Sequence, residues 1–457
     1  MSGGRIAVVG GGLAGLAAAL ECADAGAEVT LYEARSRLGG ATFSVRRQDH
    51  WIDNGQHVFV RACSAYLDFL KRLGARELVS LQPRLRVPVL CEASRPALLR
   101  RSGLPAPFQL VTSVLRYRPL ATGERLAALR AAAAMRRLDP DDPALDEQNF
   151  AEWLHERGQS ERTITSLWEL IALATLNVRV AEASLASALK VFRTALLETT
   201  DGGDIGVAEV PLQKLHGEAA GAALAEAGVR VELAAGVRAV RSEQSGFRLE
   251  LARGVEGADT VICAVPHHAA SELLPAGAVD GGALERLGAS PIVNLHLHYD
   301  RPVLAEPLAA ALDSPVQWLF DRTSASGVDR GQLVTVSVSA ARDEIRSPLR
   351  ALRERFEPAL ARLLPAAQKA ELLDLAVTRE PRATFRAAPG SRRLRPAART
   401  NLHGLYLAGA WTDTGWPATM EGAVRSGLAA AELALADLGA SSARERPVLA
   451  SSSKGSN

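Results

Sequence analysis

The chain of 457 residues is too long for one ordinary domain and predicts two or three. Its composition, 47% hydrophobic and 23% charged, is typical of a globular chain that buries a core without disulfide or metal staples. Lys and Arg total 53 against 51 Asp and Glu, so the net charge of +2 gives no indication of a nucleic-acid partner. The four cysteines form no C-x-x-C pair, which disfavours a disulfide framework or a metal site and indicates a reducing, cytoplasmic compartment.

The sequence has no run of about 18 uninterrupted apolar residues, so we expect no membrane-spanning helix. A peripheral contact with the inner face of the plasma membrane stays open. Residues 441–457 are rich in Ser and charge and are expected to be a disordered tail.

A glycine-rich turn follows the first predicted strand. The apolar run Arg5–Val9 predicts that strand, and G-x-G-x-x-G follows as Gly10, Gly12 and Gly15. These glycines permit a tight turn, a close approach of the backbone to a pyrophosphate, and packing of a helix on the strand. The predicted helix opens at Leu13 and Ala14 and runs to Ala25, and its N-terminus offers N–H groups to phosphates.

An acidic residue ends the second predicted strand, Glu28–Tyr32. Glu33 is placed to accept hydrogen bonds from a ribose. Strand, turn, helix, strand and acid occur in the order of a dinucleotide-binding unit, and a structural glycine turn without a ligand is the alternative.

The next residues indicate which dinucleotide binds. Glu33-Ala34-Arg35 runs on to Gly39 and Gly40. This stretch resembles the extended fingerprint of the FAD-binding flavin amine oxidase and carotenoid desaturase superfamily. The resemblance implies FAD, with Arg35 near the pyrophosphate and the two glycines letting the chain pass close to it. A surface salt bridge is the alternative for Arg35.

The resemblance continues near the C-terminus, where a short predicted strand ends at Gly409 and an Ala-rich helix is predicted from Met420 to about Leu438. It implies that Gly409 and Asp413 approach the pyrophosphate and ribityl group. It further implies that the start of the helix lies beneath the flavin ring, through Met420, Gly422 and Ala423. A turn or N-cap acid is the alternative for Asp413.

A middle block carries further strands. Residues 228–233 and 237–240 predict paired short strands, and 258–266 predicts a buried strand. The resemblance implies that Val237 contacts adenine through its backbone. The predicted fold is α/β: a Rossmann-like FAD-binding domain of the GR2 type, assembled from discontinuous segments, with a mixed sheet-plus-helix substrate domain.

The predicted domain ranges follow this assembly. The FAD-binding domain takes residues 1–79, 206–285 and 385–440. The substrate or cap domain takes residues 80–205, expected to be mostly helical, and 286–384.

The segment Asp53-Asn-Gly-Gln-His-Val-Phe59 is a candidate for the substrate side. The sequence of this segment, together with V-P-H-H at 265–268, resembles that of the hydroxysqualene dehydroxylases, which are squalene-associated relatives of the desaturases. The resemblance implies that Gly55, Gln56, His57 and Val58 lie along the flavin ring. It implies reductive dehydroxylation of hydroxysqualene to squalene, with Asp53 or His57 supplying or orienting the proton. A packed turn histidine is the alternative for His57.

Three other functions stay open: a carotenoid or phytoene-type desaturase, an amine oxidase, and a non-catalytic FAD-stabilised scaffold for a membrane-bound squalene-forming complex. The expected substrate is a long apolar isoprenoid, and the expected partners include other squalene-pathway enzymes. The electron donor is not identified, because no second nucleotide motif occurs.

Two further patterns allow two interpretations each. Asn294, His296 and His298 alternate with apolar residues, so they share one face of a strand that lines a polar end of the substrate cavity or is simply solvated. The segment 108–138 mixes apolar residues with arginines and would dock on anionic lipid or form an ordinary amphipathic surface helix. Its arginines are Arg116, Arg118, Arg125, Arg130, Arg136 and Arg137.

Overall fold

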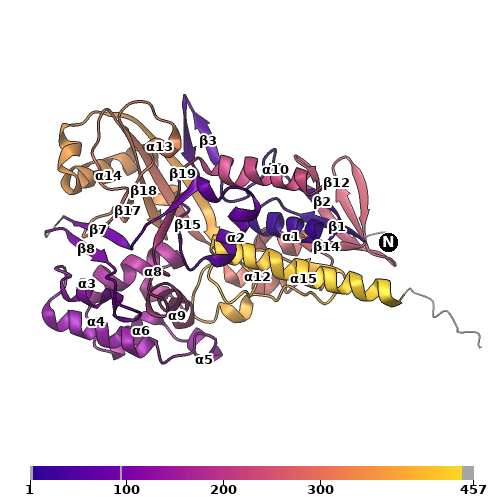
Figure 1. Ribbon diagram of the computed structural model, residues 1–457, viewed down its shortest axis with the longest axis horizontal. Coiled ribbons are helices and arrows are strands. Elements are labelled where there is room, and N and C mark those ends of the chain that lie inside the picture. Colours follow the sequence, from indigo (N-terminus) through magenta and orange to yellow (C-terminus); the bar gives the residue numbers. More distant parts are fainter. Residues whose placement is uncertain (1–3, 93–94, 445–457) are drawn as a thin grey trace, which may run out of the picture.

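The structure, a computed structural model, describes residues 4–92 and 95–444. It is an α/β fold with two main sheets: a parallel sheet flanked by long helices, and a larger mixed sheet beside a group of shorter helices (Figure 1). No helix within the described ranges is long and apolar enough to cross a membrane.

The first sheet has five parallel strands in the order β10-β2-β1-β14-β20. Their bounds are β1 (Arg5–Val9), β2 (Glu28–Tyr32), β10 (Arg230–Glu232), β14 (Thr260–Cys263) and β20 (Leu405–Leu407). Alternation along β1 sends Ile6 and Val8 into a core with α1 (Leu13–Asp24) and α15 (Met420–Arg444). Ala7 and Val9 belong to a second core, which also contains residues of the antiparallel strands β11 (Val237–Ser242), β12 (Phe247–Leu251) and β13 (Gly254–Ala258).

The two ends of the chain meet on one side of this sheet. Helices α1 and α15 lie side by side in Figure 1. A Cβ on Gly427 would lie 2.1 Å from the carbonyl oxygen of Ala14, so only glycine permits this crossing without a backbone shift. The predicted contact between widely separated segments therefore exists in the fold.

The pairing predicted for the middle block is wrong. Strand β10 pairs in parallel with β2, and β11 pairs antiparallel with β12, so the two do not pair with each other. Between them Ala234 has a φ of +51°, and the amides of Ala234 and Ala235 donate to the carbonyl oxygens of Arg35 and Glu33. Strand β10 therefore pairs with β2 at the edge of the parallel sheet, and the turn at Ala234 directs β11 away from that sheet.

The second sheet has seven strands in the order β19-β15-β18-β17-β16-β7-β8. Their bounds are β7 (Arg86–Cys91), β8 (Ala97–Arg100), β15 (Ser290–Tyr299), β16 (Leu308–Leu312), β17 (Trp318–Asp321), β18 (Gln332–Ser339) and β19 (Leu372–Thr384). Helix α14 (Leu349–Leu363) packs on one face through Phe356 and Leu360 against Val293 and Leu295. The expectation of a mostly helical 80–205 missed β7 and β8, because β7 joins this sheet through β16, far along the chain, and β8 pairs with β7.

Short helices fill most of the rest of 80–205, as predicted. They are α3 (Val111–Leu115), α4 (Thr122–Met135), α5 (Pro143–Asp146), α6 (Phe150–Glu156), α7 (Glu161–Thr163), α8 (Glu169–Leu176) and α9 (Leu185–Phe192). π-helical turns follow α7 and α9, at Ile164–Trp168 and Arg193–Leu197, and a third, η6 (Gln213–Glu218), leads into α10 (Ala219–Glu226). The expectation of a mostly helical region is confirmed.

The remaining strands form two small sheets, and four further α-helices join strands along the chain. They are β3 (Ser44–Arg47), β4 (His50–Asp53), β5 (Phe59–Val60), α2 (Ser64–Arg72), β6 (Val79–Leu81), β9 (Ile205–Ala208), α11 (His267–Leu273), α12 (Gly281–Leu287) and α13 (Thr323–Ser326). All strands of the parallel sheet come from the ranges predicted for FAD binding, and all strands of the larger sheet from the predicted substrate domain; the boundaries themselves stay a prediction.

The C-terminal helix is longer than expected. Residues 441–444, predicted to belong to a disordered tail, lie in α15, because the Ala-rich run carries the helix past the last predicted turn. Residues 445–457 of that predicted tail lie outside the described residues.

Candidate functional site

The turn between β1 and α1 has a backbone that only glycine fits. Gly10 has a φ of +113°, and a Cβ on Gly15 would lie 1.9 Å from the carbonyl oxygen of Gly10. Gly12 is the N-cap of α1 and makes no side-chain cap bond, so the first N–H groups of the helix, from Leu13 and Ala14, face the turn. This is the arrangement that binds a phosphate at a helix N-terminus.

Gly39 and Gly40 contact this turn directly. The amide of Gly39 donates to the carbonyl oxygen of Gly11 at 2.9 Å. A Cβ on Gly40 would lie 2.6 Å from the Cα of Gly12. The structure therefore brings together the two glycine segments that the sequence assigned to one site.

Glu33 lies at the end of β2 and is 8% exposed. Its two carboxylate oxygens accept hydrogen bonds from the amides of Gly11 and Arg35, each at 2.7 Å. Glu33 therefore ties the strand end to the glycine turn, and its oxygens retain lone pairs for a ribose. The Arg35 side chain is exposed, and its cofactor role stays a prediction.

The segment before Val237 lies against Ala34. A Cβ on Gly236 would lie 3.2 Å from the Cβ of Ala34. The start of β11 is thus beside the end of β2, where the predicted adenine contact through the Val237 backbone would be made.

The C-terminal segment reaches the same end of the parallel sheet. Gly409 follows β20 with a φ of +144°, and its amide donates to the Ser426 hydroxyl of α15 at 2.7 Å. Met420 begins α15, and a Cβ on Gly422 would lie 2.8 Å from the carbonyl oxygen of Pro417. Ala423, one residue on, lies in the first turn of the helix.

Asp413 forms a turn of its own. Its carboxylate accepts from the amide of Gly415 at 3.2 Å and lies 3.6 Å from the Arg392 guanidinium. This geometry fits the turn-acid interpretation, and a contact of Asp413 with the cofactor stays a prediction.

The segment after β4 surrounds a buried ion pair. Asp53 is 7% exposed and accepts hydrogen bonds from the Ser44 hydroxyl at 2.7 Å and the Leu212 amide at 3.1 Å. Arg322, 8% exposed, donates to the second oxygen of Asp53 at 3.0 Å and to the Ala208 carbonyl at 2.7 Å. Three segments distant in sequence thus converge on one carboxylate.

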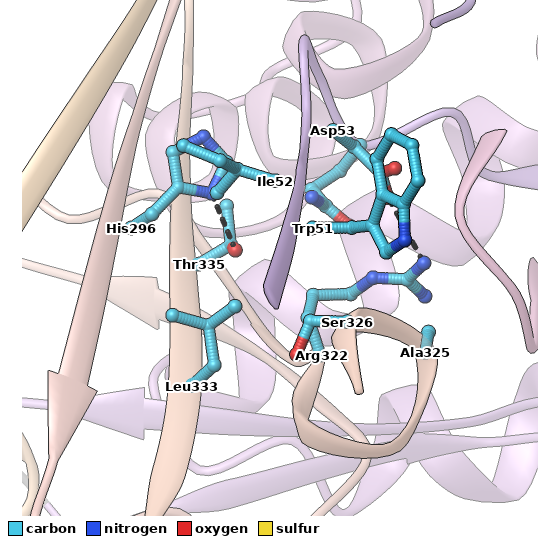
Figure 2. Close-up of a pocket in the computed structure, with 10 residues that line it drawn as sticks. Trp51, Ile52, Asp53, His296, Arg322, Ala325, Ser326, Leu333 and Thr335 are labelled. Atoms are coloured by element: carbon cyan, nitrogen blue, oxygen red, sulfur yellow. Dashed lines mark hydrogen bonds and ion pairs between the residues drawn. The ribbon is translucent and has the colours of Figure 1, made fainter. Parts of the chain in front are cut away.

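Two small pockets border this ion pair, and both are lined by Asp53, Gln56 and Arg322. The first, drawn in Figure 2, has space for about one water molecule and is also lined by Trp51 and His296. The second is lined by His57, Val58, Val207, Ala208 and Leu212. The predicted substrate-side segment therefore lines both pockets.

His57 hydrogen-bonds within its own turn. Its Nε2 lies 3.2 Å from the Oδ1 of Asn54, whose amide nitrogen donates to the Ala41 carbonyl and to Glu380. Because Oδ1 can only accept, Nε2 carries the hydrogen. Burial lowers the pKa of His57 to about 4, so the imidazole is neutral at pH 7.

The polar face of β15 is not solvated at two of its three positions. Asn294 is fully buried and His296 is 2% exposed. Asn294 donates to the Asn54 carbonyl at 3.1 Å, and His296 lies 3.1 Å from the hydroxyls of Thr335 and Thr378. The solvated alternative is therefore wrong for these two residues, and His296 lines the pocket of Figure 2.

Comparison with known proteins gives the same assignment at the level of the family. Residues 13–435 match the model of the flavin containing amine oxidoreductases. The chain belongs to this family. It is an FAD-dependent oxidoreductase, as the family resemblance of the segment from Glu33 to Gly40 implied.

Individual relatives show which members of this family the chain is similar to. The chain is 30% identical to hydroxysqualene dehydroxylase of Rhodopseudomonas palustris, covering 94% of this chain and 98% of that protein. It is 26% identical to zeta-carotene desaturase of Synechocystis, covering 95% and 97%. The predicted resemblance to hydroxysqualene dehydroxylases is thereby confirmed.

Solved structures share the fold. A putrescine oxidase with bound putrescine has a TM-score of 0.71 at 20% identity, covering 95% of this flavoenzyme and 99% of that chain. An oxidoreductase from Methanosarcina mazei has a TM-score of 0.74 at 17% identity, covering 94% and 100%.

The polar groups around the predicted ring position fit a flavin. Among the described residues, eight buried side-chain polar atoms have no hydrogen-bond partner, and five belong to the segments that meet at Asp53. These five are Gln56 Nε2, Gln213 Oε1, His216 Nδ1, Asn294 Oδ1 and Arg322 Nε. Buried polar groups ordinarily have partners, and a bound flavin, with its amide and ring nitrogen groups, or an ordered water would supply them. In this flavoenzyme the glycine turn and Glu33 would hold the dinucleotide, and residues 53–58 would face the ring.

The sequence interpretation missed several of these groups. Arg322 and Ser44 belong to no recognisable motif. Their partner Asp53 lies 269 positions from Arg322 and on the strand next to that of Ser44. His216 is fully buried and lies 2.8 Å from the Tyr66 hydroxyl. His216 stands among polar residues in Gln213–Glu218, so its burial has no sign in the sequence. Nothing in the sequence linked it to Gly39, whose added Cβ would lie 3.5 Å from the His216 Cβ.

The buried histidines of this flavoenzyme predict loss of stability in acid. Burial lowers the pKa from 6.5 to about 4 for His57 and to about 3 for both His216 and His296. Below pH 6.5 the unfolded chain binds protons that the folded chain does not, so the free energy of unfolding falls as the pH falls toward 4. At pH 5 each of the three imidazoles lowers the free energy of unfolding by about 2 kcal/mol relative to neutral pH.

The melting temperature measured from pH 7 to pH 5 should therefore fall, and less steeply in His296→Gln. His403→Gln is the matched control, because that side chain is 74% exposed. Equal slopes for His296→Gln and the unaltered protein would contradict this account.

Proposed function

We propose that this flavoenzyme reductively removes the hydroxyl group of hydroxysqualene to give squalene. The observation that carries the proposal is similarity over nearly the whole chain to proteins named hydroxysqualene dehydroxylase, at 30% identity in Rhodopseudomonas palustris and 29% in Sinorhizobium fredii. The D-N-G-Q-H-V-F segment from Asp53 to Phe59 supports it. Its sequence resembles the same group of proteins, and its residues line both pockets.

The reaction breaks an allylic C–O bond, forms a C–H bond at that carbon, and releases the departing hydroxide with a proton as water. The bound flavin would supply the hydride. The chain must hold a long apolar substrate, exclude bulk water and present a proton to the departing oxygen.

Asp53 and His57 act in this scheme by orienting polar groups. Asp53 accepts from Ser44, Leu212 and Arg322, so both of its oxygens are held by donors of the chain. His57 is neutral at pH 7, with its hydrogen directed to Asn54. The neutral imidazole of His57 does not release a proton readily at that pH.

A water beside the ion pair fits the donor role better. Gln56 Nε2 and Arg322 Nε are buried donors without partners among the described residues, and both residues line the water-sized pocket. A water that accepts from two such donors directs its own hydrogens outward, so it can hydrogen-bond the departing oxygen and relay to it a proton from solvent, which restores the water. Asp53 would fix Arg322, and Arg322 would fix the water.

The proposal is tested by incubating the purified protein anaerobically with photoreduced flavin and hydroxysqualene and measuring squalene. We expect squalene from the unaltered chain and a loss of roughly 10²-fold in rate for Asp53→Asn, because the water loses its anchored partner. His57→Gln, which can still donate to Asn54, should lose less. Unchanged alcohol while the flavin stays bound and reduced would refute the proposal.

A second candidate is favoured by the zeta-carotene desaturases, which are 24–26% identical over 93–95% of this chain. A desaturase would remove hydride from a polyene precursor rather than deliver it. Incubating the oxidised protein with phytoene or zeta-carotene distinguishes the two directions. Turnover in either assay would exclude a non-catalytic scaffold.

A further inference from the structure

Positive charge collects on one part of the predicted substrate domain. From Arg100 to Leu138 the sequence has eight arginines, no lysine and a single acidic residue, Glu124. The chain as a whole has 53 basic and 51 acidic side chains, so this excess is local. Strand β8 and helices α3 and α4, which carry it, lie together at the left edge of Figure 1.

Most of these arginines have no counter-charge. Within the described ranges, six of the eight are exposed and make no ion pair: Arg100, Arg116, Arg118, Arg130, Arg136 and Arg137. The other two are used internally, since Arg101 pairs with Asp204, and Arg125 donates to the carbonyls of Leu115, Tyr117 and Leu120. Most other exposed arginines in the described ranges form ion pairs. On α14, for example, Arg350 and Arg353 each pair with the glutamate four residues further on.

Large apolar side chains stand among these arginines. Phe108 is 57% exposed, Leu104 47% and Leu115 41%. With Leu126 of α4 they are four of the nine exposed large hydrophobic residues in the described chain. Such residues normally occur singly on a soluble surface, and a group of them marks an interaction site.

The fold holds these residues at one edge. The Arg100 amide donates to the Ser113 hydroxyl at 3.0 Å, and the Ser102 amide donates to the Gln109 carbonyl at 2.7 Å, which closes the loop that carries Leu104 and Phe108. Arg125 Nη1 donates to the Leu115 carbonyl at 2.9 Å and joins α3 to α4. Arg100, Leu104, Phe108, Leu115, Arg116 and Arg118 are called the docking edge below.

We propose that the docking edge binds the surface of a bilayer that contains anionic phospholipid. Guanidinium groups form paired hydrogen bonds with phosphate, while leucine and phenylalanine enter the boundary between headgroups and acyl chains. Apolar side chains between the arginines favour a bilayer over nucleic acid, whose backbone offers them no apolar partner. The surface would bring the enzyme to the water-insoluble substrate of the proposed function, on which this purpose rests.

The test is sedimentation of the full-length holoprotein with sucrose-loaded vesicles of phosphatidylcholine, with and without phosphatidylglycerol. We expect binding that requires phosphatidylglycerol and weakens with added salt, because exposed charges are screened. Arg116→Glu with Arg118→Glu should lower the partition coefficient by at least about tenfold. Phe108→Ser should lower it at unchanged charge, which separates insertion from attraction.

The matched control is Arg350→Glu with Arg353→Glu on α14, the same charge change on a helix that Figure 1 shows on the other side of the large sheet. It should sediment like the unaltered protein, and the flavin absorbance of each variant shows that it is folded. The proposal would be overturned if the docking-edge variant bound as well as the unaltered protein. It would also be overturned if the unaltered protein bound equally well to vesicles without phosphatidylglycerol. Release of the protein from vesicles by a single-stranded oligonucleotide at equal phosphate concentration would overturn it as well, because it would indicate a surface for nucleic acid.

The outcome separates from that of the proposed function. With hydroxysqualene dispersed in detergent, the docking-edge variants should form squalene at the rate of the unaltered protein. With substrate in anionic vesicles, they should be slower by about the loss in partitioning. Failure of every protein to act on dispersed substrate would refute the dehydroxylase proposal and leave the vesicle result standing.

Discussion

Replacing Gly15 by alanine is expected to abolish FAD binding. The added Cβ would lie 1.9 Å from the carbonyl oxygen of Gly10 and 3.2 Å from the Ala264 Cβ. The obstacle is backbone, so α1 must move away from the turn, and its first N–H groups then no longer face a pyrophosphate. We expect colourless protein after purification, and flavin absorbance per chain measures it.

The matched control is Gly123→Ala on α4, where an added Cβ meets nothing within 4 Å. This change should leave flavin content unaltered and stabilise the helix by about 0.5–1 kcal/mol. A Gly15→Ala protein that keeps full flavin content would show that the helix tolerates displacement, and would contradict the assignment of the phosphate site to this turn.

Local patterns in the sequence predicted the dinucleotide side well. Strand β1, the glycine turn, helix α1 and strand β2 are contiguous, and each is specified by residues within its own segment. The C-terminal segment was predicted for the same reason, because Gly409 and the long helix from Met420 mark a strand end and a helix start. Resemblance to one family then linked the two segments, and the contact of α1 with α15 confirms the link.

The substrate side depends on contacts that no local pattern specifies. Arg322 reaches Asp53 across 269 positions of sequence, and β7 joins its sheet through β16 more than two hundred positions away. Asn294 and His296 alternate with apolar residues as a solvated strand would, but both are buried: Asn294 bonds to the segment that follows β4, and His296 bonds to the neighbouring strands β18 and β19. Period-two patterning shows which residues share a face and does not show what covers it.

Replacing Arg322 by methionine is expected to destabilise the protein more than any surface change. The variant leaves the Asp53 carboxylate buried, with only Ser44 and Leu212 as donors, and leaves the Ala208 carbonyl without its guanidinium. Removing one partner of a buried pair costs about 3–5 kcal/mol, because the remaining charge has lost its compensation. Urea unfolding at pH 7 measures the loss.

Two comparisons distinguish this account from a simple packing effect. Arg350→Met removes an ion pair whose side chains are 89% and 63% exposed, and should cost no more than about 0.5 kcal/mol. Asp53→Asn combined with Arg322→Met removes both charges, so it should be more stable than Arg322→Met alone. If the double variant is instead as unstable as the sum of the two single changes, the charges do not interact, and Arg322 holds this part of the fold through its packing and its bond to Ala208.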